Sequence, residues 1–301
     1  MSHKEKYKTY CASSAVSLFF QPEWLDVCRH PWNVIMAEIE GHTGFWIFHV
    51  ETKMGLKFIR NPHLTPYTGL FFTNDTVPES IREKLIQQLI VDLPSIDVLE
   101  LNLDPRINAN YLFNALNNST KITNHLTLKD EETIFANFKP ALKRQIKKAH
   151  KSLHIYEADD IDLFYSLHQK TFEKQGKQAG ISLEIYMEYW SFCKQHYCGR
   201  LFFIADEQDN VHASCWLAYD DDTSYYLAGG SDSAFYGSGA MSGLMWHIIR
   251  ESILMKKRVF DFEGSMLPSV NRFFRNFSPE EKEYIYLKKI NSVIYKLLKG
   301  K

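Results

Sequence analysis

Two carboxylates in the second half of the chain have the spacing of a strand that carries chemistry on one face. The segment 259–263 reads Val-Phe-Asp-Phe-Glu, so we expect Phe260 and Phe262 to face a core. Asp261 and Glu263 would then share the opposite face, about 7 Å apart. A carboxylate in a cleft can accept the proton that an amine loses as it becomes a nucleophile. The structural alternative is that both side chains fix the next loop through backbone hydrogen bonds.

A loop with two glycines lies between a strand-like run and a helix that we expect over about 240–256. Its residues are Tyr236, Gly237, Ser238, Gly239 and Ala240. Free N–H groups at a helix N-terminus, made approachable by glycines, bind phosphate or carboxylate. The residues from Gly237 to Ala240 are therefore candidates for cofactor binding. In the alternative, the glycines only satisfy backbone angles and a serine caps the helix.

A helix with one basic face is predicted over 139–151. Apolar residues recur at three- and four-residue steps on one face, and the other face is cationic with Lys139, Lys143, Arg144, Lys147, Lys148 and Lys151. Such a face can hold a diphosphate, a tRNA backbone or anionic lipid head groups. A solvated charged face is the alternative. Arg144 and Lys148 lie one turn apart and are the candidates for phosphate binding.

Three tyrosines accompany these groups. Tyr225 and Tyr226 lie in a strand-like run, and Tyr236 lies in the loop. A tyrosine hydroxyl could protonate a leaving group, so Tyr236 joins Asp261 and Glu263 as a catalytic candidate. Tyr225 is a candidate for substrate binding, although half-buried tyrosines are common in strands.

The bulk composition limits the classes of function. The 301 residues are 45% hydrophobic, and 35 basic residues balance 36 acidic ones. One or two packed cores are therefore expected, and any attraction to nucleic acid or membrane must be local, with no DNA partner indicated. The five cysteines are scattered without C-x-x-C spacing, which argues against disulfides and zinc and favours a reduced, cytoplasmic setting. The histidines lack metal-ligand spacing, so no metal is expected.

The N-terminal residues are polar, and no apolar run reaches about 18 residues. We therefore expect neither a signal peptide nor a membrane span. Walker A, H-E-x-x-H and G-x-S-x-G motifs do not occur in the sequence, which leaves the chemistry to the groups described above.

The order of strand and helix patterns occurs twice. Residues 32–60 predict an antiparallel meander, Pro78 begins a helix, and 98–116 reads strand then helix. At an offset of 161 residues, 98–116 lies over 259–277, and Asn110 meets Asn271. We therefore predict an α/β fold (α+β with a mixed sheet) that arose by tandem duplication, with domains 1–135 and 136–301. Chance agreement of a common α/β pattern is the alternative.

Three segments carry a resemblance to a known family. KPALKRQIKKAHK, YYLAGGSDSAFYGSGA and FDFEGSMLPSVNRFFRNF resemble the Fem-type branch of the GNAT acyltransferase superfamily, which includes peptidoglycan interpeptide-bridge aminoacyltransferases. The resemblance covers about 136–290. It implies tandem GNAT-like domains, and an acyl donor that is either acyl-CoA or aminoacyl-tRNA. It also places Asn271 among the substrate-binding candidates. Members that use coenzyme A usually carry Gln or Arg where this chain has Ala234, which is a departure from that pattern.

The leading hypothesis is an N-acyl or aminoacyl transferase acting on an amine of a cell-envelope or sugar-linked metabolite. The acceptor would be small or lipid-linked, tRNA is a partner if it carries the acyl group, and peripheral contact with the inner membrane surface fits such an acceptor. Backbone N–H groups near Gly237–Ala240, or on an adjacent strand, would stabilise the oxyanion. The alternative is a catalytically silent binding module that recognises a phosphorylated glycan precursor or a partner.

Overall fold

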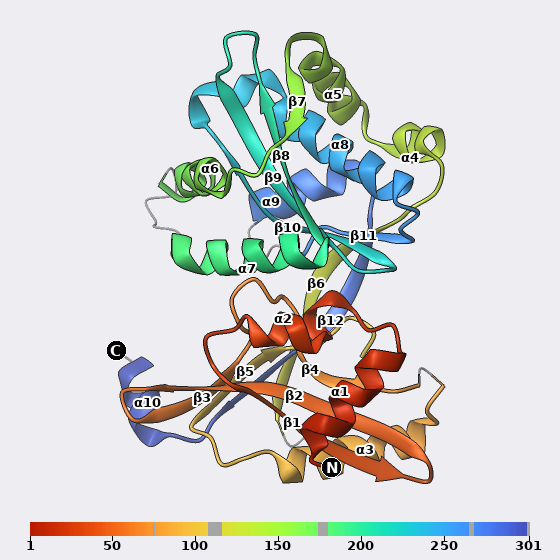
Figure 1. Ribbon diagram of the computed structural model, residues 1–301, viewed down its shortest axis with the longest axis vertical. Helices are drawn as coiled ribbons and strands as arrows, with labels where there is room; N and C mark the ends of the chain where they lie inside the picture. The colour runs from red at the N-terminus through yellow and green to blue at the C-terminus, as the bar shows by residue number, and fades with distance from the viewer. Residues whose placement is uncertain (75, 108–115, 174–179, 265–267, 300–301) are drawn as a thin grey trace. The chain divides into compact units, whose positions relative to one another are not determined.

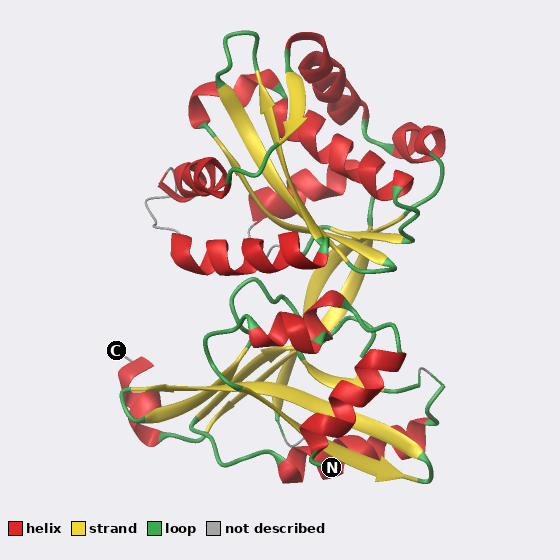
Figure 2. Ribbon diagram, in the orientation of Figure 1, coloured by secondary structure: helices red, strands yellow, loops and turns green. Residues whose placement is uncertain are grey.

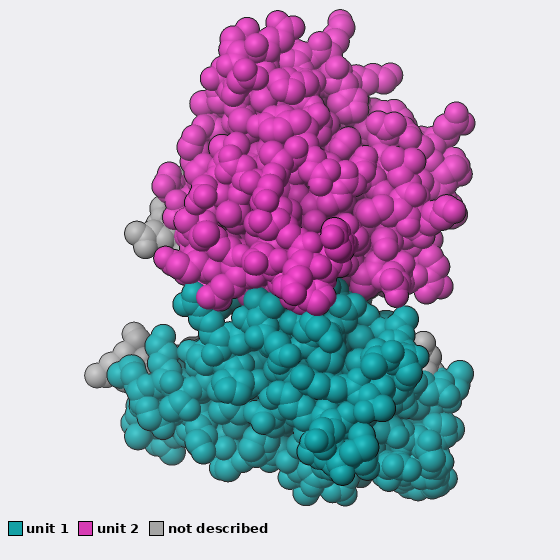
Figure 3. All heavy atoms as spheres, viewed as in Figure 1, with its two compact units in different colours: residues 1–122, 283–301 teal, residues 123–282 magenta. Residues whose placement is uncertain are grey.

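The structure is a computed structural model that describes residues 1–299 except 75, 108–115, 174–179 and 265–267. It has two compact units (Figure 3): unit 1 comprises residues 1–122 and 283–301, and unit 2 comprises residues 123–282. Within the described residues, no helix is long and apolar enough to cross a membrane.

Unit 1 is built on a mixed sheet whose strands run in the order β1-β2-β3-β5-β12, with β4 paired to β2. The antiparallel meander expected over 32–60 is confirmed by the β1–β2 and β2–β3 pairings, and β3 and β5 run parallel. Its helices and strands, drawn in Figure 1, are α1 (His3–Ser13), η1 (Leu18–Phe20), α2 (Pro22–Asp26), β1 (Trp32–Ile39), β2 (His42–Lys53), β3 (Leu56–Arg60), β4 (Gly69–Phe72), α3 (Glu79–Asp92), β5 (Val98–Asn102), the first part of β6 (Asn117–Thr127), most of β12 (Glu280–Ile290) and α10 (Val293–Lys299).

The same sheet continues through β6 into the strands of unit 2, in the order β6-β11-β10-β9-β8-β7, among which only β10 and β11 are parallel neighbours. The remaining elements of unit 2, coloured by type in Figure 2, are α4 (Glu131–Asn137), α5 (Pro140–Ser152), β7 (His154–Glu157), α6 (Ile161–Glu173), α7 (Leu183–His196), β8 (Gly199–Ala205), β9 (Val211–Tyr219), β10 (Thr223–Ser231), η3 (Ser233–Ser238), α8 (Ala240–Leu254), β11 (Val259–Asp261), α9 (Pro268–Phe274) and η4 (Arg275–Phe277).

Helices cover both faces of the unit 2 sheet. Cys215 and Leu217 of β9 join the core cluster that contains α5 and α8. Trp216 lies between them in sequence and points to the other face, where its ring meets Phe164 of α6 and Trp190 of α7 edge to face. Because both faces are buried, β8 and β9 are almost continuously apolar rather than alternating.

The two halves of the chain exchange equivalent strands. Shifting β6 (Asn117–Thr127) by the 161-residue offset gives 278–288, which overlaps β12 (Glu280–Ile290). Yet β6 pairs with β11 of unit 2, and β12 pairs with β5 of unit 1. The compact units therefore divide at 122/123 and 282/283 and do not follow the expected boundary between 135 and 136. The division into 1–135 and 136–301 stays a prediction about the ancestry of the halves.

Most elements predicted for the second half are present where the periodicity placed them. The apolar face of α5 is buried at Leu142, Ile146 and Ala149, as expected. The segment PSVNRFFRNF forms α9 and η4. Its counterpart in the first half, the helix expected over 108–116, falls mainly on residues 108–115, which lie outside the described residues.

Candidate active site

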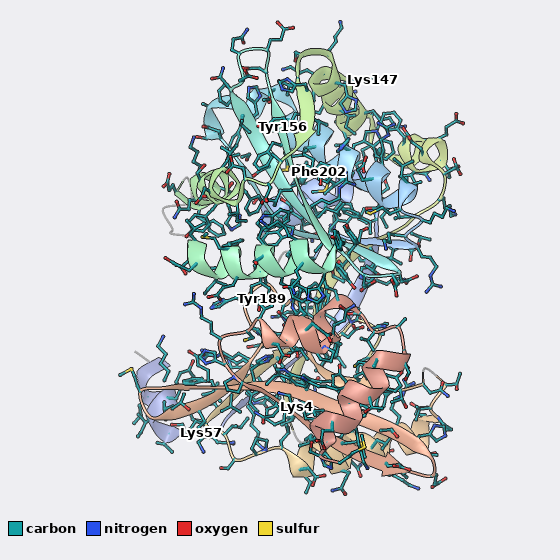
Figure 4. The ribbon with its side chains drawn as sticks, in the orientation of Figure 1. Lys4, Lys57, Lys147, Tyr156, Tyr189 and Phe202 are labelled. Atoms are coloured by element: carbon teal, nitrogen blue, oxygen red, sulfur yellow. The ribbon has the colours of Figure 1, made fainter. Side chains whose placement is uncertain are left out.

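The basic helix α5 packs directly against the loop that precedes α8. Lys148 Nζ donates a 2.5 Å hydrogen bond to the Gly237 carbonyl, while Arg144 and Lys147 (labelled in Figure 4) are exposed. Gly239 has φ of +82°, and a Cβ there would lie 2.6 Å from the Gln145 carbonyl oxygen of α5. A side chain is therefore excluded at Gly239 both by space and by backbone conformation. The structure thus brings the predicted loop and the predicted cationic helix together.

A hollow of about 250 Å³ opens at the start of α8. Its walls come from α5, the end of β10, η3, the first turn of α8 and α9, and they include Gln145, His212, Ser231, Asp232, Phe235, Tyr236, Gly239, Ala240, Met241, Ser242 and Phe273. Gly239 is the N-cap residue, and no side chain caps α8 there, although Ser238 Oγ accepts a hydrogen bond from Ala240 N. The N-terminus of this 15-residue helix thus opens on the hollow, and the positive end of a helix dipole favours an anion. From α5 only Gln145 lines the hollow, while Lys148 contacts the neighbouring Gly237 carbonyl.

One acidic residue also lines the hollow. Asp232 is bound by Lys170, whose Nζ lies 2.6 Å from Oδ2, and it accepts a hydrogen bond from Ala234 N. These contacts lower the pKa of Asp232, the hydrogen bond from Lys170 contributing most. Its charge is therefore balanced by Lys170 and does not oppose an anion on its own.

The wall of the hollow contains a histidine that sequence reasoning missed. The His212 ring stacks on Phe235 with centroids 3.9 Å apart and an interplanar angle of 8°. Its Nε2 lies 3.3 Å from Asp206 Oδ2, and its buried Nδ1 has no hydrogen-bond partner among the described residues. A single histidine inside an apolar strand gives no sequence signal of such a position.

At the second predicted cluster the strand is shorter than expected. Phe260 and Phe262 are fully buried, as predicted. However, β11 ends at Asp261, and Glu263 adopts a left-handed backbone conformation with φ of +50°. The expectation that Asp261 and Glu263 share one strand face is therefore wrong, because the chain has already turned at Glu263.

Asp261 is a buried anchor for the segment that follows β11. Its Oδ1 accepts hydrogen bonds from Thr123 Oγ1 at 2.7 Å and from the Glu263 backbone N–H at 2.8 Å. Its Oδ2 lies 3.2 Å from His125 Nε2, and Gly264 N donates to the same Thr123 hydroxyl at 2.8 Å. Asp261 therefore holds the backbone turn in place. Thr123 and His125 come from β6 in the other half of the sequence, so no local pattern could have pointed to them.

Glu263 places a carboxylate out of contact with water. The residue as a whole is half-buried, but Oε1 is shielded from solvent and has no hydrogen-bond partner among the described residues. Burial, followed by the charge of Asp261, raises the pKa of Glu263 well above its ordinary value of 4.5. Unpaired buried carboxyls are rare in folded proteins and cluster at functional sites.

Buried tyrosines surround this carboxyl. The Tyr186 hydroxyl lies 2.8 Å from His168 Nε2, and His168 Nδ1 lies 2.8 Å from the Gly229 carbonyl oxygen. Burial lowers the pKa of His168, so the ring is neutral, with Nδ1–H donating to Gly229 and Nε2 accepting from Tyr186. Burial is the main cause that raises the pKa of Tyr186 and Tyr226, and the charge of Glu263 raises both further. Both phenols therefore stay protonated beside Glu263.

The edge of β10 connects the two clusters. Its parallel ladder with β11 ends at the pair Tyr225–Asp261, whereas its ladder with β9 continues to Ser231. Among the described residues, no strand pairs with the β11 side of β10 beyond Tyr225. From Tyr225 to Ser231, which lines the hollow, six residues of strand span about 20 Å. Side chains of α6 occupy part of this edge, since the Gly229 carbonyl accepts from His168 and Ser231 N donates to Thr171 Oγ1. The remaining backbone groups are those that an extended ligand would meet.

The other predicted site residues take structural contacts. Tyr225 is buried, and its hydroxyl donates to Asp220 Oδ2 at 2.7 Å. Asn271 of α9 accepts a 3.1 Å hydrogen bond from Asn124. Tyr236 is 46% exposed and belongs with Gly239 and Ala240 at the hollow. The described residues contain no group of three or more His, Cys, Asp or Glu side chains arranged for a metal ion.

The chain is similar to known proteins in two ways. Residues 136–275 match the family described as acetyltransferase (GNAT) domain. FemX has the same fold over 99% of this chain and 98% of its own, with a TM-score of 0.69 at 11% identity. The C-terminal domain (DUF2156) of a protein provisionally named lysylphosphatidylglycerol synthetase, from Agrobacterium fabrum, covers 99% and 96% with a TM-score of 0.56 at 9% identity.

A tandem GNAT protein from the clavulanic acid biosynthesis pathway covers 94% of this chain and 92% of its own, with a TM-score of 0.50 at 7% identity. No curated protein matches the chain by sequence. Residues 136–275 therefore match a GNAT acetyltransferase domain, in the half of the chain where the sequence analysis expected it. The fold of the whole chain is similar to those of FemX and of this tandem GNAT protein, which confirms the fold that the resemblance implied.

Proposed function

We propose that this protein transfers an activated acyl or aminoacyl group to an amine of a cell-envelope or sugar-linked metabolite. The observation that carries this proposal is the edge of β10 beyond Tyr225, with which no strand of the described residues pairs on the β11 side; it runs from the hollow at the α8 N-terminus toward the buried carboxyl of Glu263. A donor with an anionic part at one end and an activated acyl group at the other fits these two ends. Acyl-CoA and aminoacyl-tRNA both meet that description.

In the proposed reaction, the amine nitrogen attacks the acyl carbonyl carbon and forms the C–N bond. Glu263 accepts the proton that the amine loses, and its raised pKa makes its carboxylate a stronger base than that of an ordinary glutamate. Backbone N–H groups on the β10 edge stabilise the oxyanion. The bond from the carbonyl carbon to the donor's sulfur or oxygen then breaks, and the leaving group takes up a proton, for which Tyr236 stays the candidate donor.

The acceptor class rests on two supports. Fem-type proteins, which the chain resembles, act on peptidoglycan precursors, and another protein with this fold is provisionally named for a lipid-linked lysyl product. An amine on a glycan or lipid carrier suits a site whose proton acceptor is kept out of water. We therefore place the acceptor among cell-envelope or sugar-linked amines.

The first experiment is native mass spectrometry of freshly purified protein, which identifies a retained donor or acceptor by mass. Transfer from labelled acyl-CoA and from labelled aminoacyl-tRNA is then measured with the amines so identified. We expect Glu263→Gln to fold normally and to lower turnover about a hundredfold, the usual effect of losing a general base. The matched control is Glu207→Gln, which changes an exposed glutamate of the β8–β9 turn and should leave turnover unchanged.

A silent binding module is the second candidate, and one departure favours it. Ala234 stands where members of the resembled family that use coenzyme A usually carry Gln or Arg. A retained ligand without transfer from either donor would establish this reading. Full turnover in Glu263→Gln would instead leave transfer in place and remove Glu263 from the mechanism.

A further inference from the structure

Four apolar side chains, on the β2–β3 turn and on α10 of unit 1, are exposed to solvent. Met54, at the turn between β2 and β3, is 89% exposed. Val293, Ile294 and Leu297 of α10 are 68%, 64% and 68% exposed. Isolated exposed apolar residues are ordinary, but a group of them marks an interaction surface. We call these four residues the C-terminal patch.

The three α10 members share the side of the helix that faces away from the sheet. Tyr295 faces the sheet, because its ring lies 5.5 Å from that of Phe58 and its hydroxyl accepts a hydrogen bond from Arg60 at 3.0 Å. Leu297 is three residues from Ile294 and four from Val293, and positions three and four apart lie on one side of a helix. Val293, Ile294 and Leu297 therefore point outward together, opposite Tyr295.

Hydrogen bonds link α10 to the hairpin that carries Met54. Ser292 N, just before α10, donates to the Asp97 carbonyl, and Lys57 N of β3 donates to Asp97 Oδ2 at 2.8 Å. Lys53 and Leu56 pair on either side of the turn that contains Met54. Met54 is three residues from Lys57, a length of chain of about 10 Å. Figure 1 shows α10 at the same end of unit 1 as the turn between β2 and β3, and Figure 4 labels Lys57 there.

Two exposed lysines lie beside the apolar residues: Lys53, next to Met54 and on the sheet face of Phe58, and Lys296 on α10. Lys57 and Lys289 are exposed as well, but strand alternation turns them to the opposite face of the sheet. The acidic groups of this region are Glu51, which is half-buried, and Asp97, whose carboxylate is engaged by Lys57 N. The chain as a whole has a net charge of only −1, so this excess of positive charge is local.

We propose that the C-terminal patch docks on an anionic lipid surface. Apolar side chains that project beside Lys53 and Lys296 match the boundary between acyl chains and acidic head groups. The alternative occupant, a second copy of the chain meeting the same patch in a two-fold contact, would bring the lysines of both copies together. Charge complementarity therefore selects the lipid. This inference stands apart from the proposed transfer reaction, since none of its residues belongs to the candidate active site.

The test is co-sedimentation of the full chain with vesicles of phosphatidylcholine, with and without phosphatidylglycerol. We expect binding only to the vesicles that contain phosphatidylglycerol, weakening as salt is raised. Lys53→Gln with Lys296→Gln should lower the partition coefficient about 25-fold, since each lysine near the surface contributes about fivefold. Ile294→Ser with Leu297→Ser should lower it at least about tenfold through lost apolar insertion.

The control is Val91→Ser with Leu254→Ser, which removes two apolar side chains that are 77% and 72% exposed elsewhere. Partitioning of this variant should equal that of the unchanged protein, and melting temperatures of all variants should agree. The proposal is overturned if the unchanged protein ignores anionic vesicles or if the control variant loses as much binding. It is also overturned if light scattering shows a dimer that Ile294→Ser with Leu297→Ser dissolves.

Discussion

Strands β5 and β11 correspond under the 161-residue offset. Each carries an anchoring carboxylate, but the polar residues that come two positions later have different partners. In the middle of β5, Glu100 is bound by Arg60 at 3.1 Å and by Lys288 at 3.6 Å. At the end of β11, Asp261 is held by Thr123, by His125 and by the Glu263 backbone. Both carboxylates thus serve as anchors within their own unit.

Two residues further on, the ends differ. Asn102 follows Glu100, and its side chain and backbone are bonded to Lys121, Pro66 and Asn61. Glu263 follows Asp261 and keeps a buried carboxyl oxygen without a partner among the described residues. Folding alone would favour the satisfied arrangement of Asn102. The contrast indicates that unit 1 uses this position for structure, and that unit 2 keeps a titratable group there at a cost in stability.

The largest stability effect that distinguishes the two ends should come from their anchors. Asp261→Asn should lower the free energy of unfolding by about 1–3 kcal/mol, because buried hydrogen bonds from Thr123 and the Glu263 backbone are weakened. Glu100→Gln should cost about 1 kcal/mol or less, since the Arg60 side chain it releases is 34% exposed and water can solvate it. Urea denaturation measures both. Equal losses would show that the two anchors are equivalent.

A smaller effect is expected at the other end of the β10 edge. Arg144→Ala with Lys148→Ala should weaken binding of the transferred donor about tenfold and flatten its salt dependence, because two cations leave the anion site. Stability should barely change, as exposed charges contribute little. The matched control is Lys139→Ala with Lys151→Ala at the two ends of the same helix. If titration calorimetry gives both pairs the same affinity, the face of α5 is only solvated surface.

The sequence predicted the parts of this site that local periodicity determines. The amphipathic pattern of α5 and the glycines before α8 are readable from spacing, and the structure brings them together at Lys148 and Gly237. The alternation at 259–263 pointed to the two carboxylates as candidates, but it did not predict the turn at Glu263. The left-handed backbone conformation of a glutamate does not change the pattern of apolar residues.

The contacts that the sequence could not predict join residues that are far apart along the chain. Thr123 is 138 residues from Asp261 in sequence, and it reaches Asp261 only because β6 pairs with β11 rather than with its own half. The pair His168 and Tyr186 lies on two helices whose patterns show only which faces are buried. Such contacts depend on tertiary packing, which periodicity does not encode.

The titration of Glu263 tests the central claim most directly, and it needs no substrate. Carbon NMR of protein labelled at glutamate carboxyl carbons, compared with Glu263→Gln, identifies the signal of this residue. We expect it to titrate well above 4.5, because burial and the charge of Asp261 both disfavour the carboxylate. A raised folded-state pKa also means that Glu263 contributes most to stability below about 4.5 and that this contribution is lost as pH rises through the folded-state pKa. Glu263→Gln should therefore gain melting temperature relative to the unchanged protein over that range. A signal that titrates near 4.5, with no pH-dependent gain in Glu263→Gln, would contradict a buried, unpaired proton acceptor at the end of β11.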